Sequence, residues 1–421
     1  MSGTGGQENR DRAVLRRLAE QLAEIAALPV HKQTIEGWKR LNDLKPGKPM
    51  IYIYQEPWHE LDVEGELTLQ CQDEFCRGVE LEMRRTLYKW RHMRGDMVVE
   101  PWFGCPPVLH DSGLGLQEDV DIVRTDEKSD IISRHYHAQI KDEADLEKIQ
   151  TPQLTYDAEA TARNYQRLCD LFGDILPVRR CGVGSMYYAP WDWLVGWWGV
   201  QEALTDLVER PELAHAAMER LTNAWLARLD QLEQLNLLGL NNHLITGNGG
   251  LGYTDELPPA DYDPAHIRTR DIWAGATSQI FGVVSPPMHE EFALRYEARY
   301  LNRFGLNYYG CCDPLDLKVD ILRRNLPRLR KISMSPWVNV ERGAQAIGQD
   351  YVFSYKPNPA VLAGDVWNPE QVRRDLRHLL EVTRGCHVEI ILKDISTVRY
   401  QPRRLWEWAE IACQVSAEFA L

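Results

Sequence analysis

Short apolar runs of β-type composition alternate with amphipathic segments along most of the chain. Turn residues bound the runs, and apolar residues recur at helical spacing in the segments between them. A strand followed by a helix, repeated, predicts parallel strands joined by crossover helices. About eight such repeats, preceded by two helices, predict an α/β fold of the (β/α)8 or TIM barrel type. The predicted strands are residues 50–54, 97–103, 178–183, 237–240, 279–284, 306–311, 331–335, 351–355 and 387–392.

The domain organisation follows from the same repeat. An open, doubly wound sheet is the structural alternative, and it is disfavoured because no G-x-G-x-x-G motif follows an early strand. Residues 111–145 are polar and do not fit the repeat, so they predict an inserted hairpin or lid. We therefore expect an N-terminal tail and helices over residues 1–48, with residues 1–8 disordered, and one barrel domain over residues 49–421.

Composition excludes several classes of protein. The chain has 421 residues and a formal net charge of −14, which argues against nonspecific nucleic-acid binding. No apolar run is long enough for a membrane-spanning helix, and the polar first 16 residues do not resemble a secretory signal. Nine cysteines are an odd number spread over a long chain, which does not look like a disulfide framework. We expect a cytoplasmic protein.

Polar and aromatic side chains concentrate at the predicted carboxyl ends of the strands, where barrels of this type carry their working groups. Lys356 and Lys393 could bind a substrate carboxylate or form an imine, and solvated or salt-bridged lysines are the alternative. Cys311 and Cys312 could supply a thiolate to a metal or act as a nucleophile, and inert buried cysteines are the alternative. His243 is interpreted as a metal ligand, a general base or a hydrogen-bonded loop residue.

The tryptophans suggest an aromatic-walled cavity. The chain has 14 Trp, and four of them fall within residues 191–198. One helix face cannot bury four indoles, so we expect some of them to line a ligand site. The tryptophans that follow predicted strands are Trp58, Trp102, Trp191, Trp193, Trp197, Trp198 and Trp337.

Two further segments have structural interpretations beside functional ones. The Gly-rich residues 247–252 could cradle an anion, but they lack Gly-Lys-Ser/Thr, and a tight loop is the alternative. Basic residues between positions 313 and 330 predict a solvated helix face rather than a docking site for a partner. They are Lys318, Arg323, Arg324, Arg328 and Arg330.

Residues 284–292 (VSPPMHEEF) are followed by a predicted helix and then by residues 309–313 (YGCCD). Together these segments resemble the uroporphyrinogen decarboxylase superfamily, nearest to the branch that includes corrinoid-dependent methyltransferases. The resemblance extends from about residue 50 onward and is clearest over residues 279–410. It implies a (β/α)8 barrel with N-terminal helices, in agreement with the strand–helix repeat.

The methyltransferase branch commonly carries a zinc-binding His-x-Cys pair after this strand and a further Cys late in the chain. Here Tyr309 stands at the histidine position, and Cys386 precedes the last predicted strand instead of following it. The resemblance therefore implies zinc only through other ligands, with Cys311, Cys312, His289 and His243 as candidates. The decarboxylase branch carries early arginines that hold its polyanionic substrate. This chain has Gln55-Glu56-Pro57-Trp58 there, which excludes uroporphyrinogen as the substrate.

The resemblance implies a methyltransferase acting as a demethylase, which moves a methyl group from a small methoxylated or methylated compound to a corrinoid on a partner protein. The predicted catalytic residues are Asp313, His243, Tyr309 and Glu56. The predicted substrate-binding residues are Trp58, Trp102, Tyr188, Trp191, Trp337, Lys356, Lys393 and Asp394. A decarboxylase of a small carboxylic acid and a noncatalytic small-molecule-binding barrel are the alternatives. By analogy with the superfamily, a homodimer is expected.

Overall fold

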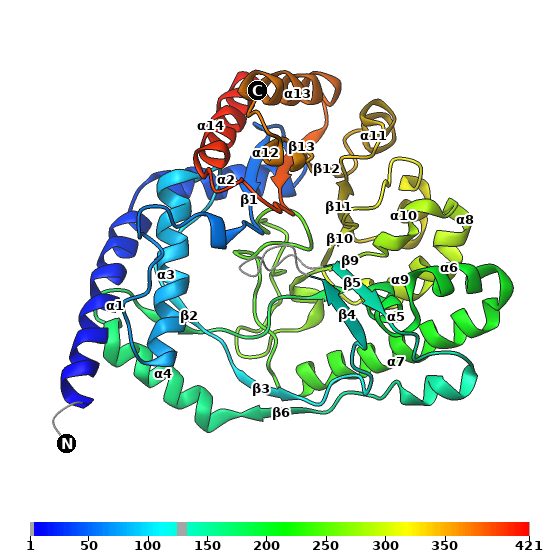
Figure 1. Cartoon of the computed structure of the whole chain (residues 1–421), viewed down its shortest axis with the longest axis horizontal. Coiled ribbons are helices and arrows are strands. Elements are labelled where there is room, and N and C mark those ends of the chain that lie inside the picture. The colour runs from blue at the N-terminus through cyan, green and yellow to red at the C-terminus, as the bar shows by residue number, and fades with distance from the viewer. Residues whose placement is uncertain (1–3, 124–132, 421) are drawn as a thin grey trace.

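A seven-stranded parallel sheet forms the centre of the protein in the computed structural model, which describes residues 4–123 and 133–420 (Figure 1). Every strand pair in this sheet is parallel, as strand–helix repeats require. In spatial order the strands are β1 (Met50–Ile53), β13 (His387–Leu392), β12 (Val352–Tyr355), β11 (Leu329–Met334), β10 (Leu306–Tyr309), β9 (Trp273–Ala276) and β8 (Tyr187–Tyr188).

The α/β class and the parallel sheet are confirmed. The sheet does not close by strand pairing in the described part of the chain, because β1 and β8 are its two edges. A separate parallel pair joins β2 (Phe103–Cys105) to β7 (Val178–Arg180), and a parallel bridge joins Val183 to Leu238. A closed barrel of eight strands therefore stays a prediction.

Helices lie around the central sheet in Figure 1, and α14 contacts β1. Among the described residues, no helix combines the length and apolar character that crossing a membrane requires. The α-helices are α1 (Thr4–Ala26), α2 (Val30–Asn42), α3 (Glu74–His92), α4 (Ala158–Phe172), α5 (Pro190–Trp198), α6 (Val200–Glu209), α7 (Pro211–Gln234), α8 (Pro286–His289), α9 (Arg295–Leu301), α10 (Val319–Asn325), α11 (Val340–Ile347), α12 (Ala360–Ala363), α13 (Pro369–Val382) and α14 (Arg403–Glu418). Shorter helical segments are η1 (Trp58–Glu60), η2 (Glu143–Lys148), η3 (Thr269–Asp271), η4 (Gln279–Val283) and η5 (Glu290–Leu294), the last a π-helix.

Three predicted strands are wrong, among them residues 97–103, of which only Phe103 lies in a strand, β2. Residues 279–284 fold mainly as the 3-10 helix η4, and residues 237–240 contribute only the bridge at Leu238. Strand β9 takes the place of the predicted strand 279–284. Its sequence, Trp-Ala-Gly-Ala, has no β-branched residue. A Cβ at Gly275 would lie 2.8 Å from the Gly247 Cα and 2.9 Å from the Tyr187 ring. Close packing against Gly247 and Tyr187 therefore selects glycine at position 275 over the β-formers that a propensity argument expects.

The two other departures from the repeat lie near the N-terminus and in the insertion. Helix α1 already begins at Thr4, so most of the predicted disordered tail is helical, and residues 1–3 lie outside the described residues. Strand β3 (Val108–Asp111) pairs antiparallel with β6 (Leu154–Asp157), and β4 (Val120–Val123) pairs antiparallel with β5 (Ser133–Tyr136). The β4–β5 pair agrees with the predicted hairpin, whose tip, residues 124–132, also lies outside the described part.

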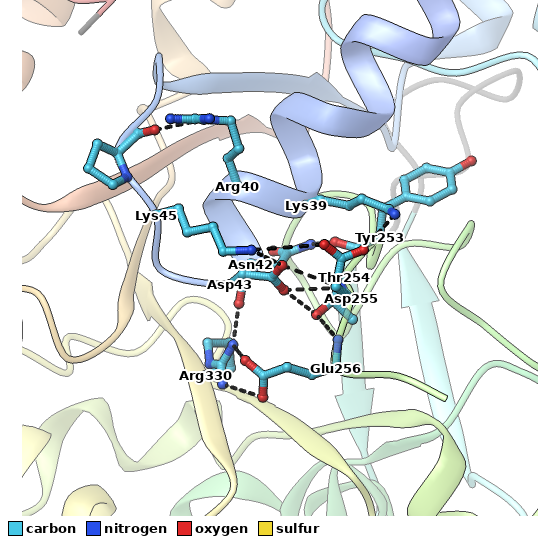
Figure 2. A network of polar contacts seen from close by, with 11 residues as sticks. Lys39, Arg40, Asn42, Asp43, Lys45, Tyr253, Thr254, Asp255, Glu256 and Arg330 are labelled. Carbon is cyan, nitrogen blue, oxygen red and sulfur yellow. Dashed lines mark hydrogen bonds and ion pairs between the residues drawn. The ribbon is translucent and has the colours of Figure 1, made fainter. Parts of the chain in front are cut away.

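A polar network holds the end of α2 against residues 251–256 and the start of β11 (Figure 2). The fully buried Asn42 donates to the carbonyl oxygens of Leu251 (2.9 Å) and Tyr253 (2.7 Å). Arg330 of β11 donates to the Asn42 carbonyl and forms an ion pair with Glu256 (2.7 Å). These contacts fix the N-terminal helices to the sheet.

Replacing Asn42 with Ala is expected to lower the free energy of unfolding by about 1–3 kcal/mol, because two carbonyl oxygens lose their donor. Denaturant unfolding followed by circular dichroism measures the loss. The control is Lys39→Ala in the same network, which removes a partly exposed ion pair with Asp255 and should cost less than about 1 kcal/mol. Equal losses in the two variants would contradict the importance of the buried amide.

Candidate functional site

The chain turns sharply at the end of β10 and presents two cysteines and an aspartate. Gly310 has φ +100°, and a Cβ there would lie 2.4 Å from the Leu315 side chain, so only glycine fits the turn. The Cys311 sulfur lies 3.4 Å from the Cys312 sulfur and 3.3 Å from the Lys393 Nζ. Cys311 and Lys393 are buried, whereas Cys312 is exposed.

The end of β13 supplies the other half of this cluster. Lys393 Nζ lies 3.1 Å from Asp394 Oδ2 and donates to Asn248 Oδ1 at 3.2 Å, and Cys312 Sγ lies 3.5 Å from Asp394 Oδ2. Asp394 has φ +55°, a left-handed conformation that Asp tolerates better than most residues. We call Cys311, Cys312, Lys393, Asp394 and Asn248 the thiol–lysine cluster.

The cluster favours a thiolate at Cys311. The hydrogen bond from Cys312 and the charge of Lys393 lower the pKa of the Cys311 thiol to about 7, although burial opposes them. The same hydrogen bond, together with burial, raises the pKa of Cys312. At neutral pH the cluster therefore contains one reactive sulfur and one thiol that donates to it.

Alkylation of Cys311 by iodoacetamide is expected to follow a titration with a midpoint near pH 7. In the Lys393→Met variant the midpoint should move upward, because the thiolate loses its cation. Peptide mass spectrometry at a series of pH values measures the rate. Cys413 serves as an internal control, since burial raises its pKa to about 11. A Cys311 midpoint at or above the ordinary value of about 8.5 would contradict the assignment.

Asp313 is buried directly beside the cluster. Its Oδ1 accepts a hydrogen bond from the Cys311 backbone N–H (3.2 Å), and its Oδ2 has no hydrogen-bond partner within the described residues. Burial raises the pKa of the Asp313 carboxyl, although the Cys311 N–H, the charge of Lys318 and the nearby Thr277 hydroxyl oppose it. A buried carboxyl with a raised pKa and with one oxygen that makes no hydrogen bond has the arrangement of a general acid.

Lys356, at the end of β12, is a buried amine with neutral partners. Its Nζ donates to the hydroxyl of Tyr308, to Ser354 O (3.0 Å) and to Ser354 Oγ (2.8 Å). No ion pair links it to a carboxylate among the described residues, and burial lowers the pKa of Lys356 to about 7. In contrast, the neighbouring Lys331 forms a fully buried ion pair with Glu389 (2.8 Å).

Tyr309 and His289 belong to a buried hydrogen-bond chain. Lys318 Nζ contacts His289 Nδ1 (3.0 Å), and His289 Nε2 contacts the Tyr309 hydroxyl (2.6 Å). Tyr309 donates to Glu297 Oε2 (2.5 Å), and Ser278 donates to Glu297 Oε1 (2.7 Å). Burial raises the pKa of Glu297 to about 8 and lowers the pKa of His289 well below its ordinary value.

This hydrogen-bond chain engages one of the predicted metal ligands, His289. Both ring nitrogens of His289 are engaged inside the protein, so His289 does not join Cys311 and Cys312. Within residues 4–123 and 133–420, no three His, Cys, Asp or Glu side chains are grouped as ligands of a metal would be. The residues present therefore do not fit a zinc site of the predicted composition.

Two predicted catalytic residues have other contacts. Glu56 forms a buried ion pair with Lys89 (2.5 Å), and the His243 ring packs edge-on against Trp102 (5.0 Å between ring centroids). Burial lowers the pKa of His243. Within the described part of the chain, no hydrogen bond or ion pair joins Glu56 or His243 to the thiol–lysine cluster, so the structure does not bring them together with Asp313.

The aromatic residues also depart from expectation. Tyr188 is fully buried and hydrogen-bonds Thr222 of α7 (2.8 Å), and the buried Trp191 donates to the Phe292 carbonyl (3.0 Å). Both therefore pack within the helical layer rather than at an open cavity. Trp191, Trp197 and Trp198 belong to one hydrophobic cluster in which several helices meet. That cluster therefore buries more indoles than a single helix face could. Trp337 is exposed (69%), and Trp58 packs beneath the Arg85 guanidinium (4.9 Å).

The Gly-rich residues 247–252 pack against the sheet. A Cβ at Gly249 would lie 2.5 Å from Glu389 and 2.7 Å from the Tyr308 ring, and one at Gly250 would lie 2.2 Å from Trp38. These glycines permit close packing of the backbone on buried side chains, which is the tight-loop alternative. The loop also places Asn248 against Lys393 and against the hydroxyl of Tyr187.

Sequence reasoning missed Lys318 and Glu297. Lys318 was expected on a solvated face, but it is 3% exposed and donates to the Phe281 carbonyl (2.5 Å). It directly precedes α10 in irregular backbone, so helical periodicity does not describe its direction. Glu297 lies on α9 with no sequence signal to distinguish it from a surface glutamate. Only the fold brings it to Tyr309.

Comparison with solved structures finds a similar fold in a methyltransferase from Methanosarcina mazei. The match has a TM-score of 0.50 and 13% sequence identity, and it covers 90% of this chain and 97% of that chain. No protein-family model matches the sequence, and no curated protein matches it. At this level of identity the likeness shows the fold alone. The predicted superfamily therefore stays a prediction.

Proposed function

We propose that this protein is a methyltransferase that takes a methyl group from a small methoxylated or methylated compound and passes it to a corrinoid on a partner protein. One observation carries the proposal: the free Oδ2 of buried Asp313, held beside Cys311 and Lys393 at the carboxyl edge of a parallel sheet. The likeness in fold to the methyltransferase from Methanosarcina mazei supports it, as do the superfamily-like segments 284–292 and 309–313. We further propose that the sheet belongs to a (β/α)8 barrel.

The chemistry assigns Asp313 the role of acid. When the methyl–oxygen bond of an ether breaks, the oxygen keeps the bonding electrons and needs a proton. Asp313 would deliver that proton from Oδ2, leaving an alcohol or phenol and an aspartate. The aspartate would then be stabilised by the Cys311 backbone N–H, which already donates to Oδ1. The methyl group leaves without the bonding electrons and therefore needs a nucleophilic acceptor.

A reduced corrinoid supplies such a nucleophile when bound. The exposed Cys312 and the half-exposed Asp394 mark the side of the cluster from which an acceptor would approach. No step passes through zinc, because the residues present do not fit a zinc site.

The test follows the visible spectrum of cob(I)alamin in the presence of the purified protein and a panel of methoxyarenes and methylated amines. Conversion to methylcob(III)alamin that depends on both protein and substrate is expected. The reaction should survive treatment with metal chelators. An unchanged spectrum across the whole panel, with folded protein, would contradict the proposal.

Lys356 favours a second candidate, a decarboxylase of a small carboxylic acid. A buried amine without a carboxylate partner could hold the carboxylate of a substrate, which would raise its pKa again. This candidate predicts release of CO2 without any corrinoid. Measuring CO2 in the assays described above separates the two functions.

A further inference from the structure

We propose that Cys311 and Cys312 form a redox-modification site, at which a hydroperoxide oxidises Cys311 and Cys312 then closes a disulfide between the two neighbours. The inference concerns the reactivity of the two sulfurs and does not depend on the proposed function.

The two sulfurs lie in contact within a bent segment of the chain. Their separation of 3.4 Å is van der Waals contact, and the segment bends at both residues. All nine cysteines are free, and in the described part of the chain this is the one pair joined by a sulfur–sulfur hydrogen bond. A second thiol at contact distance converts oxidation of the first into disulfide formation.

Each of the two sulfurs has a charged side chain beside it. The Lys393 ammonium lies 3.3 Å from Cys311 Sγ and stabilises the thiolate, which is the species that attacks peroxides. Cys312 Sγ lies 3.5 Å from Asp394 Oδ2, so a carboxylate is in place to accept the proton that Cys312 loses. Cys311 is 8% exposed and Cys312 is exposed, so a molecule as small as a hydroperoxide can approach from the Cys312 side.

Oxidation of the cysteine pair takes two steps. The Cys311 thiolate attacks the peroxide oxygen, the O–O bond breaks, and the leaving oxygen takes a proton to give an alcohol or water, with a sulfenic acid on Cys311. Cys312 then loses its proton and attacks the Cys311 sulfur, and the S–O bond breaks with release of water. Two thiols are oxidised by one peroxide in total. The product no longer has a thiolate beside Lys393.

The test treats the full-length protein with hydrogen peroxide, blocks free thiols, and maps peptides without reduction. The peptide with both cysteines is expected to lose two hydrogen atoms in mass, at a lower peroxide concentration than modifies Cys413, and to recover with dithiothreitol. Cys312→Ser should stop at a sulfenic acid that dimedone traps on Cys311. Cys311→Ser should give neither product.

Cys413→Ser is the matched control, since it removes a cysteine on α14 that is not part of the pair and should leave the disulfide yield unchanged. The wild-type comparison with Cys413 needs no variant and holds even if a substitution impairs folding. Oxidation of Cys413 before Cys311, or a stable sulfenic acid on Cys311 in the wild type without disulfide, would overturn the proposal.

Discussion

Replacing Asp313 with Asn is expected to lower the rate of methyl transfer by about 10²- to 10⁴-fold, the range typical of losing a general acid. The amide oxygen of Asn can still accept the hydrogen bond from the Cys311 N–H, so the turn after β10 should persist. What the variant loses is the proton on the free oxygen. Single-turnover rates with a methoxylated substrate and cob(I)alamin measure the effect.

The pH dependence gives a second readout of the same variant. The reaction needs the protonated carboxyl, so the wild-type rate should fall as pH rises through the elevated pKa of Asp313, whereas Asp313→Asn should not show that decline. Asp320→Asn, at an exposed carboxylate on α10, is the control and should keep the wild-type rate. A wild-type rate in Asp313→Asn would remove Asp313 from the mechanism.

Replacing Glu389 with Gln is expected to lower the free energy of unfolding by about 3–5 kcal/mol, because the fully buried Lys331 loses its only ion-pair partner among the described residues. The amide has nearly the same shape, so the loss reports the charge rather than a cavity. Without Glu389 the folded-state pKa of Lys331 falls further. The unfolded state then binds more protons, and the variant should regain stability as pH rises. Chemical denaturation at several pH values measures both effects.

Two variants test this interpretation. Lys331→Met combined with Glu389→Gln removes both charges and should recover most of the stability that Glu389→Gln loses. Glu418→Gln removes a partly exposed ion pair with Arg377 and should cost less than about 1 kcal/mol. A loss of less than about 1 kcal/mol in Glu389→Gln would show that the buried pair does not stabilise the fold as argued.

The sequence predicts a strand correctly where an apolar run of β-type residues is bounded by turn residues. The strands near residues 306, 331, 351 and 387 combine apolar runs with turn residues at their ends, and each lies in the sheet. Strand β9 escaped prediction because it has no β-branched residue and its Gly275 packs against Gly247 and Tyr187, which are distant in the sequence.

The site could be predicted only as far as strand ends determine it. Two strand ends supply the cluster: β10 is followed by Cys311 and Cys312, and β13 by Lys393 and Asp394. The sheet brings these two ends together. The sequence could not show that the predicted substrate-binding residues Tyr188 and Trp191 point away from a ligand site. Their directions depend on Thr222 and Phe292, which lie in neighbouring helical segments. Glu297 and Lys318 were missed for the same reason.

The most direct test of the proposed methyl transfer uses a substrate with an isotope-labelled methoxy group, cob(I)alamin and the purified protein, with label and CO2 followed in one reaction. The account predicts labelled methylcobalamin and free phenol in equal amounts, without CO2. Release of CO2 with the labelled methyl group still on the substrate would contradict it and favour the decarboxylase.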